Sequence, residues 1–216
     1  MSAALEPRTP PTRPILFGRS SSHFSRVARM LAAELQVAYD FRVVPDLLSS
    51  NVDDYGGNPG LRMPTLQTHR GLLFGALNIG RELARQSSLR PRVVWPEDLH
   101  EPVLANAQEL TVQSMATEVA LILGKISGID QSKHHAKMRT SLLGSMAWLE
   151  GHARDFLRAL PSDRDFSFLE ITLFCLITHL EFRDVLPLGP YPELSKFSRD
   201  FAERPSARET VYRFDA

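Results

Sequence analysis

The chain has 216 residues but only one cysteine, Cys175, and this scarcity excludes several classes of protein. A single cysteine cannot form an internal disulfide framework or a cluster of cysteine metal ligands, and without a Cys-x-x-Cys pair thioredoxin-type disulfide exchange is excluded as well. Cys175 stands among leucine and isoleucine in a helical pattern, which predicts a small buried hydrophobe. This cysteine usage suits a reducing, cytoplasmic compartment.

The chain also lacks an excess of charge and any long apolar run. Lysine plus arginine and aspartate plus glutamate number 25 each, so no strong field favours nucleic acid or an anionic membrane as a partner. No stretch approaches ~18 consecutive apolar residues, so no transmembrane helix is expected. The segment 1–13 carries proline and arginine but no apolar signal region, and we expect it to be a flexible lead.

Motifs for metal, phosphate or acyl chemistry are missing too. His134 and His135 adjoin each other at a predicted helix start, but no cysteine or carboxylate stands at ligand spacing from them. The sequence has no glycine-rich phosphate loop and no Ser-His-Asp order. It therefore predicts no metal site.

The stretch 58–84 reads as a strand with a proline, a turn, a second strand, a glycine and a helix. Proline cannot donate to a strand ladder, so we expect Pro64 to begin its strand after a cis Met63-Pro64 bond. Met63, held extended, would offer its backbone N–H and C=O to an extended peptide ligand. Gly75 opens a helix whose amides can hold an anion. The alternative is that Pro64 only shapes the strand. The polar segment before this stretch predicts one short helix near 46–50.

A strand–helix–strand unit comes first in the chain. The apolar run 14–18 predicts a buried strand, and alternating residues at 38–44 predict a second one. Between them, apolar residues at helical spacing from Phe24 onward predict an amphipathic helix. Arg26 and Arg29 fall on its wet side, as solvated charges or as interdomain pairs. A right-handed crossover makes the two strands parallel, so the first part has the order βαβ–ββα.

Beyond a predicted linker at 87–98, the chain is helical. Ser167 and Glu170 have the spacing of a capping box, and the helix that they open is apolar nearly all round, which predicts burial on every side. The last helix is expected to stop at Pro205. The predicted helices cover residues 102–125, 133–159, 167–182 and 191–203.

The order of these motifs resembles the glutathione transferase family. In the first part the matching residues are Asn58-Pro59, Met63-Pro64, Leu66, Gly71, Asn78-Ile79 and Leu83-Ala84. In the second part they are Ser167 with Glu170 where the family usually has aspartate, Tyr191-Pro192-Glu193-Leu194, and Arg204-Pro205. The resemblance covers roughly residues 14–210 and implies an α/β thioredoxin-like N-terminal domain plus an all-α C-terminal domain. The implied domains are 14–86, which binds glutathione, and 99–216, which is all-helical.

The resemblance also places candidate chemistry before the first helix. The segment Ser22-His23-Phe24-Ser25-Arg26-Val27-Ala28-Arg29 is similar to the family's Ser-Pro-aromatic-x-Arg-x-x-Arg pattern, with histidine in place of proline. It implies that Ser22 stabilises the thiolate of glutathione, with Ser20 and Ser21 as rivals within the triple serine. His23 is a candidate glutathione contact, or simply a partly exposed histidine. Ser22 is equally suited to cap the helix, and the two roles are compatible.

One departure from the family falls at the glutathione site. Gly75-Ala76 stands where the family usually has Glu-Ser, the pair that holds the γ-glutamyl end of glutathione. A lost hydrogen bond to a charged group is worth ~1.5–3 kcal/mol, so affinity falls ~10- to 100-fold for each. Asn78, in the first turn, is a candidate replacement. Otherwise the site binds another ligand or is vestigial.

Two functions are therefore weighed. The first is a glutathione transferase-like enzyme that activates the glutathione thiol for attack on a small apolar electrophile, with Leu110, Met115 and Val119 as the electrophile site. The resemblance implies a homodimer and a role such as detoxification. The second is a non-catalytic binding or interaction protein of the same fold with a degraded glutathione site. Glutathione binding, and the effect of Ser22→Ala on turnover, separate them.

Overall fold

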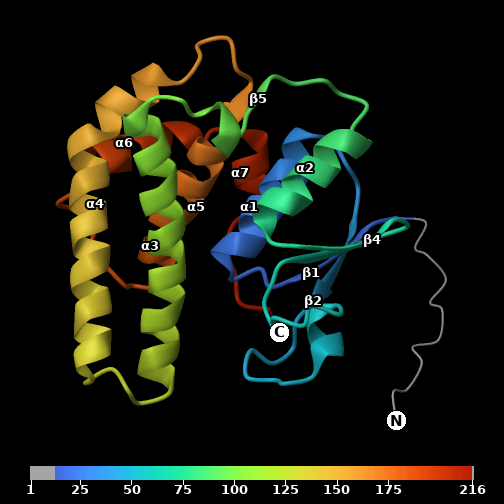
Figure 1. The fold of residues 1–216 in the computed structure, drawn as a ribbon, viewed down its shortest axis with the longest axis horizontal. Helices are drawn as coiled ribbons and strands as arrows, with labels where there is room; N and C mark the ends of the chain where they lie inside the picture. The colour runs from blue at the N-terminus through green and yellow to red at the C-terminus, as the bar shows by residue number, and fades with distance from the viewer. Residues whose placement is uncertain (1–12, 216) are drawn as a thin grey trace.

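The computed structural model describes residues 13–215, which form a small sheet with two helices beside a group of longer helices (Figure 1). The flexible lead expected at 1–13 lies outside the described residues except for its last position. The elements of the first half are β1 (Ile15–Gly18), α1 (His23–Glu34), β2 (Asp40–Val43), the single turn η1 (Val52–Tyr55), β3 (Thr65–Thr68), β4 (Gly71–Phe74) and α2 (Ala76–Gln86).

The four strands of the first half lie in the order β2-β1-β3-β4. β1 and β2 are parallel, as the strand–helix–strand pattern predicts, and β3 runs antiparallel to both β1 and β4. α1 and α2 pack against each other on one side of this sheet (Figure 1). The apolar stripe of α1 is buried there, including Val27 and Leu31, which are both 0% exposed. The predicted thioredoxin-like order is confirmed.

The short helix predicted near 46–50 is wrong. Asp46 accepts a hydrogen bond from the N–H of Leu48 at 2.9 Å, which closes a turn there instead. The only helical turn of this loop is η1, which begins after Asn51, whose side chain accepts from the backbone two residues on. Gly56 ends it with a φ of 64°, a conformation that favours glycine.

The second half consists almost wholly of helices. Its elements are β5 (Val93–Val94), the turn η2 (Pro96–Asp98), α3 (Pro102–Ile126), α4 (Lys133–Ala159), β6 (Phe166–Ser167), α5 (Phe168–Phe182), α6 (Pro192–Phe201) and α7 (Pro205–Glu209). The segment predicted as a linker contains β5, which pairs parallel with β6 just before α5. Pro205 does not simply end the chain's helices; it begins α7, because proline suits the first turn of a helix. None of the helices of residues 13–215 is long and apolar enough to cross a membrane.

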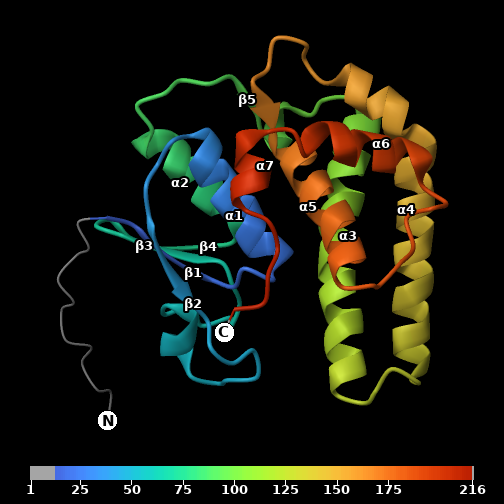
Figure 2. The ribbon, with the colours of Figure 1, turned by 180° about the vertical axis from the view of Figure 1, so that it is seen from behind.

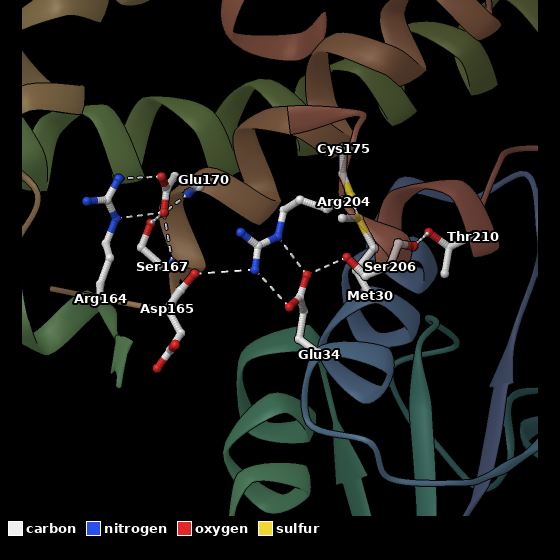
Figure 3. A network of polar contacts seen from close by, with 10 residues as sticks. All are labelled: Met30, Glu34, Arg164, Asp165, Ser167, Glu170, Cys175, Arg204, Ser206 and Thr210. Carbon is white, nitrogen blue, oxygen red and sulfur yellow. Dashed lines mark hydrogen bonds and ion pairs between the residues drawn. The ribbon is translucent and has the colours of Figure 1, made fainter. Parts of the chain in front are cut away.

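α5 is the central helix of this half, as its uniform apolar sequence predicts. Its start is the expected capping box: Ser167 Oγ accepts from the N–H of Glu170 at 3.0 Å, and the Glu170 carboxylate accepts from the N–H of Ser167 at 2.9 Å. Arg164 donates to the same carboxylate at 2.9 and 2.5 Å (Figure 3). The predicted burial of Cys175 is confirmed, since it is 0% exposed in the middle of α5.

α1 joins the two halves, because it packs against α2 on one side and against α5 and α7 on the other (Figure 2). At its C-terminal end Glu34 accepts two hydrogen bonds of 2.8 Å from Arg204 and one of 2.5 Å from Ser206 (Figure 3). Burial tends to raise the pKa of Glu34, but Arg204 and Ser206 outweigh it and hold that pKa below its ordinary value. Further along, Met30 Sδ lies 3.6 Å from Cys175 Sγ.

The prediction that Arg26 and Arg29 lie on a wet face is wrong, because they are only 4% and 8% exposed. Arg26 donates to the hydroxyl of Thr178 at 2.9 Å and to the carbonyl of Ala207 at 3.1 Å, so the alternative of an interdomain contact holds for it. Arg29 lies over the ring of Phe41. The helical half therefore covers Arg26, which the isolated pattern leaves to solvent, and the sheet contributes to the burial of Arg29.

Candidate functional site

A cavity of about 860 Å³ lies between the two halves. The first half contributes the loop after β1, the segment before β3 and the start of α2, and the second half contributes α3 and parts of α5. This volume suits a small organic ligand. The segments that the sequence singled out as a serine loop, a backbone clamp and an anion site all border this one cavity.

The structure separates the three candidate serines. Ser21 and Ser22 line the cavity, whereas Ser20 does not; it is 1% exposed and its N–H donates to Asp215 at 2.8 Å. Ser22 is the N-cap of α1, and its Oγ accepts from the N–H of Ser25 at 3.3 Å. Because that bond uses only a lone pair, the hydroxyl hydrogen of Ser22 can donate to a ligand. The cap and the ligand contact are thus compatible in this geometry.

Met63 and Pro64 border the same cavity, and their peptide bond is cis, as expected from the sequence. β3 begins only at Thr65, so Met63 stands just outside the ladder. Between residues 13 and 215, neither the N–H nor the C=O of Met63 has a backbone hydrogen-bond partner. Both groups can therefore pair with an extended ligand, which is the arrangement that a backbone clamp requires.

Gly75 is the N-cap of α2, and Gly75, Ala76 and Asn78 all line the cavity. The φ of Gly75 is 81°, which favours glycine over the acidic residue usual at this place in the resembling family. Gly75 offers no side-chain cap, so the first amides of α2 keep their affinity for an anion. Asn78 is exposed and donates to the carbonyl of Phe74 at 3.1 Å, which leaves its side-chain oxygen for a ligand.

The expected electrophile wall is only partly placed by the structure. Val119 lines the cavity, but Met115 is 0% exposed and Leu110 packs against the core, and neither borders the cavity. The helical period explains this, because Val119 lies on the side of α3 that faces the cavity, whereas Leu110 and Met115 lie toward the core. The apolar residues of α3 that line the cavity are Val112, Ala116, Val119, Ile122, Leu123 and Ile126.

His23 is neither partly exposed nor alone. It is 1% exposed, and its Nδ1 lies 2.9 Å from Nδ1 of His179 and 3.3 Å from Oε2 of Glu118. His179 Nδ1 lies 2.7 Å from Oε1 of Glu118, and its Nε2 lies 2.9 Å from the carbonyl oxygen of Ser21. These three side chains, here called the buried cluster, come from α1, α3 and α5. Both histidines also border the cavity.

The charge of the buried cluster is set by burial and by its own members. Burial lowers the pKa of His23, and His179 adds to this, against the raising effect of Glu118. Burial by itself raises the pKa of Glu118, but contacts to His179 and His23 outweigh it, so that pKa lies below its ordinary value. Glu118 is therefore an ionised carboxylate with no exposure to water.

Sequence reasoning missed Glu118 and His179 entirely. A signal was present, because His179 interrupts a helix that is otherwise apolar nearly all round, and Glu118 lies on the buried side of α3. Ionisable side chains are rarely buried without partners. The partner of each lies far away in the sequence, and only the tertiary structure brings the pair together.

Known proteins resemble this chain in structure but not in sequence. No model of a known protein family matches the sequence, and no curated protein matches it either. Solved structures do match. The structure resembles a glutathione S-transferase from Methylobacillus flagellatus with bound GSH, at 18% identity, with 93% of this chain and 100% of that chain covered and a TM-score of 0.73.

Two further structures agree with this likeness. One is a glutathione transferase family member from Pseudomonas fluorescens with bound glutathione, at 20% identity, covering 93% of this chain and 99% of that one, with a TM-score of 0.73. The other is Gtt2 from Saccharomyces cerevisiae, at 14% identity, covering 91% and 100%, with a TM-score of 0.69. The chain thus has the glutathione transferase fold, which confirms the predicted fold class.

Proposed function

We propose that the chain is a glutathione transferase-like enzyme that binds glutathione in the cavity and activates its thiol for attack on an apolar electrophile. The observation that carries the proposal is the convergence of Ser22, the unpaired backbone of Met63 and the start of α2 on one cavity. Solved structures of the same fold with glutathione bound support it. Gly75-Ala76 is the feature that opposes it.

In this proposal each segment has one task. The backbone N–H and C=O of Met63 pair with the peptide of glutathione as a short added strand. The free amides at the start of α2 hold its γ-glutamyl carboxylate, in place of the Glu-Ser pair usual in the resembling family.

The hydroxyl of Ser22 donates to the sulfur, and together with the amides at the start of α1 it stabilises the thiolate, so the proton leaves to water at neutral pH. The thiolate then attacks an electrophile held against the apolar stripe of α3 that contains Val112 and Val119. In the proposed reaction a carbon–sulfur bond forms, and a leaving group departs or an adjacent double bond takes up a proton.

The second candidate is a non-catalytic protein that holds an apolar ligand in the same cavity. The observation that favours it is Gly75-Ala76, which supplies neither a hydroxyl nor a carboxylate to the γ-glutamyl end. Under this candidate glutathione does not bind, and Ser22 only caps α1.

Calorimetric titration with reduced glutathione tests the proposal. We expect binding in the micromolar to low-millimolar range, and turnover of a chlorodinitrobenzene that Ser22→Ala lowers by ~10- to 100-fold. Ser132→Ala is the matched control, because Ser132 caps α4 through the N–H of His135 at 3.1 Å but does not line the cavity. Both variants lose ~1 kcal/mol of stability as caps, and only the first should lose turnover.

The opposite results are equally clear. No heat and no rise in melting temperature at about 10 mM glutathione would favour the non-catalytic candidate. Equal turnover in the Ser22→Ala and Ser132→Ala variants would show that Ser22 is a cap alone. The homodimer and the cytoplasmic location implied by the family resemblance stay predictions; sedimentation of the purified chain tests the first, and fractionation of cells tests the second.

A further inference from the structure

We propose that the buried cluster of His23, Glu118 and His179 is a binding site for a divalent transition-metal ion, best suited to Zn²⁺. The sequence predicted no metal site, because the neighbouring histidines that it displays have no further ligand beside them. The cluster instead joins residues up to 156 positions apart. The inference goes beyond the proposed function and does not depend on glutathione binding.

The distances within the cluster fit a coordination shell. The contacts are 2.9 Å between the two Nδ1 atoms, 2.7 Å from His179 Nδ1 to Glu118 Oε1, and 3.3 Å from His23 Nδ1 to Glu118 Oε2. Zinc binds histidine nitrogen and carboxylate oxygen at ~2.0–2.2 Å in a tetrahedron, so ligand atoms around one ion are themselves ~3.3–3.6 Å apart. The contact between His23 and Glu118 already has that separation, and the two shorter contacts would widen by several tenths of an ångström to admit the ion.

The hydrogen-bonding pattern leaves lone pairs facing one another. A carbonyl oxygen only accepts, so His179 Nε2 must carry the proton that it donates to Ser21 at 2.9 Å. When the His179 ring is neutral, its Nδ1 holds a lone pair, and this atom faces the Glu118 carboxylate and Nδ1 of His23. A proton on Nδ1 can serve one of these contacts at a time. A metal ion accepts a lone pair from all three side chains at once.

The surroundings of the cluster are those of a ligand set. A metal-binding histidine usually donates its other ring N–H to a carbonyl or carboxylate, and His179 does this toward Ser21. Glu118 is 0% exposed, and its only ion-pair partners among residues 13–215 are the two histidines, with no lysine or arginine. Among residues 13–215, Glu118 Oε2 is approached by His23 Nδ1 at 3.3 Å and accepts no shorter hydrogen bond. A carboxylate buried in this way destabilises the folded chain unless a cation pairs with it.

The donor set also selects the kind of ion. Two imidazoles and one carboxylate suit Zn²⁺ and its first-row neighbours, whereas Ca²⁺ and Mg²⁺ prefer oxygen ligands alone. Because both histidines border the cavity, an ion can reach the cluster from there. Once bound, it would link α1 of the first half to α3 and α5 of the second, and so stabilise the folded chain.

The experiment uses the full-length chain without a histidine tag, freed of metal by a chelator. Zn²⁺ is titrated against a colour-changing competitor in the absence of glutathione. We expect one Zn²⁺ per chain, a rise of several degrees in melting temperature, and visible absorption bands with Co²⁺ in place of Zn²⁺. Glu118→Gln keeps the shape of the side chain but removes the anion, and should weaken binding at least ~100-fold, since even outer-shell partners are worth 10- to 100-fold.

His134→Gln is the matched control, because it removes a histidine of α4 that lies outside the cluster, and it should leave the affinity unchanged. Equal affinity in wild type and Glu118→Gln, loss of binding in His134→Gln, or no binding at all would each overturn the proposal. If Glu118→Gln fails to fold, nitrogen NMR of the wild-type histidines decides. Zn²⁺ must then shift the Nδ1 signals of two of the seven histidines, and unchanged Nδ1 signals would overturn the site.

Discussion

A carboxylate lies at each end of α1, at the boundary between the halves, but the two carboxylates have different partners. At the C-terminal end, Glu34 accepts from the guanidinium of Arg204 and from Ser206 (Figure 3). At the N-terminal end, the ion-pair partners of Glu118 within residues 13–215 are two imidazoles. The first carboxylate is permanently neutralised, whereas the second depends on what cation reaches it.

The C-terminal end of α1 therefore has a structural task, and the N-terminal end has a chemical one. A bidentate guanidinium–carboxylate pair holds the halves together over the whole physiological pH range. A histidine cluster beside a cavity can change its charge or its ligand. Between the ends, the buried thiol of Cys175 donates to Met30 Sδ at 3.6 Å, a contact that carries no charge. Four experiments test this assignment of tasks, and they are given in order from the largest expected effect to the smallest.

Arg204→Ala should remove the ion pair that joins the two halves at the C-terminal end of α1. It leaves Glu34, whose side chain is only 14% exposed, without its guanidinium partner. We expect the free energy of unfolding to fall by about 2–3 kcal/mol, toward the range for breaking a buried pair. Lys196→Ala removes an ion pair of 2.7 Å whose side chains are about two-thirds exposed, and should cost below about 0.5 kcal/mol. Denaturant unfolding measures both, and equal losses would contradict the assignment of tasks.

Acid should act on the same end through Glu34. Its pKa is lowered on folding from an ordinary value of 4.5, so its contribution to stability is complete above that value. As the pH falls below 4.5 and through the lowered pKa, the contribution is lost, by at most ~1.4 kcal/mol per pH unit for one proton. Glu34→Gln cannot titrate, so its stability should fall less steeply over this window. Parallel curves for the two proteins would remove Glu34 as the cause.

Ala76→Ser sharpens the functional side, because it returns to the start of α2 the hydroxyl that the resembling family has there. If glutathione binds as proposed, its dissociation constant should fall ~10-fold, the worth of one hydrogen bond to a charged group. Gly75→Glu should not help, because the φ of 81° strains a residue with a side chain. Ala105→Ser, on an exposed position of α3, is the control. Calorimetry with glutathione distinguishes the three variants.

The smallest effect is expected when the folded protein is treated with a reagent that labels the thiol of Cys175. Burial raises the pKa of its thiol to about 12, so the native protein should not react with a thiol reagent near pH 8. The same reagent should label one thiol per chain after unfolding in guanidinium chloride. Rapid labelling of the folded protein would mean that the boundary between α1 and α5 opens readily.

Much of the fold could be read from local pattern. The stripe beginning at Phe24 predicted α1, the capping box of Ser167 and Glu170 predicted the start of α5, and the order of motifs predicted the thioredoxin-like sheet. The predictions that were wrong concern residues whose exposure or conformation is set by side-chain contacts that a hydrophobic pattern does not show. The wet face assigned to Arg26 is covered by the helical half, and the helix expected near 46–50 gave way to side-chain turns.

The candidate site divides in the same way. The sequence by itself determined the backbone features, namely Ser22 at a helix start, Met63 before a proline and Gly75 before a helix, because each depends only on near neighbours in the chain. Only the tertiary structure decided that Met115 is buried behind the cavity wall, and that Glu118 and His179 meet His23. Such contacts depend on the angles and positions at which the helices cross, and these cannot be read from the spacing of residues along the chain.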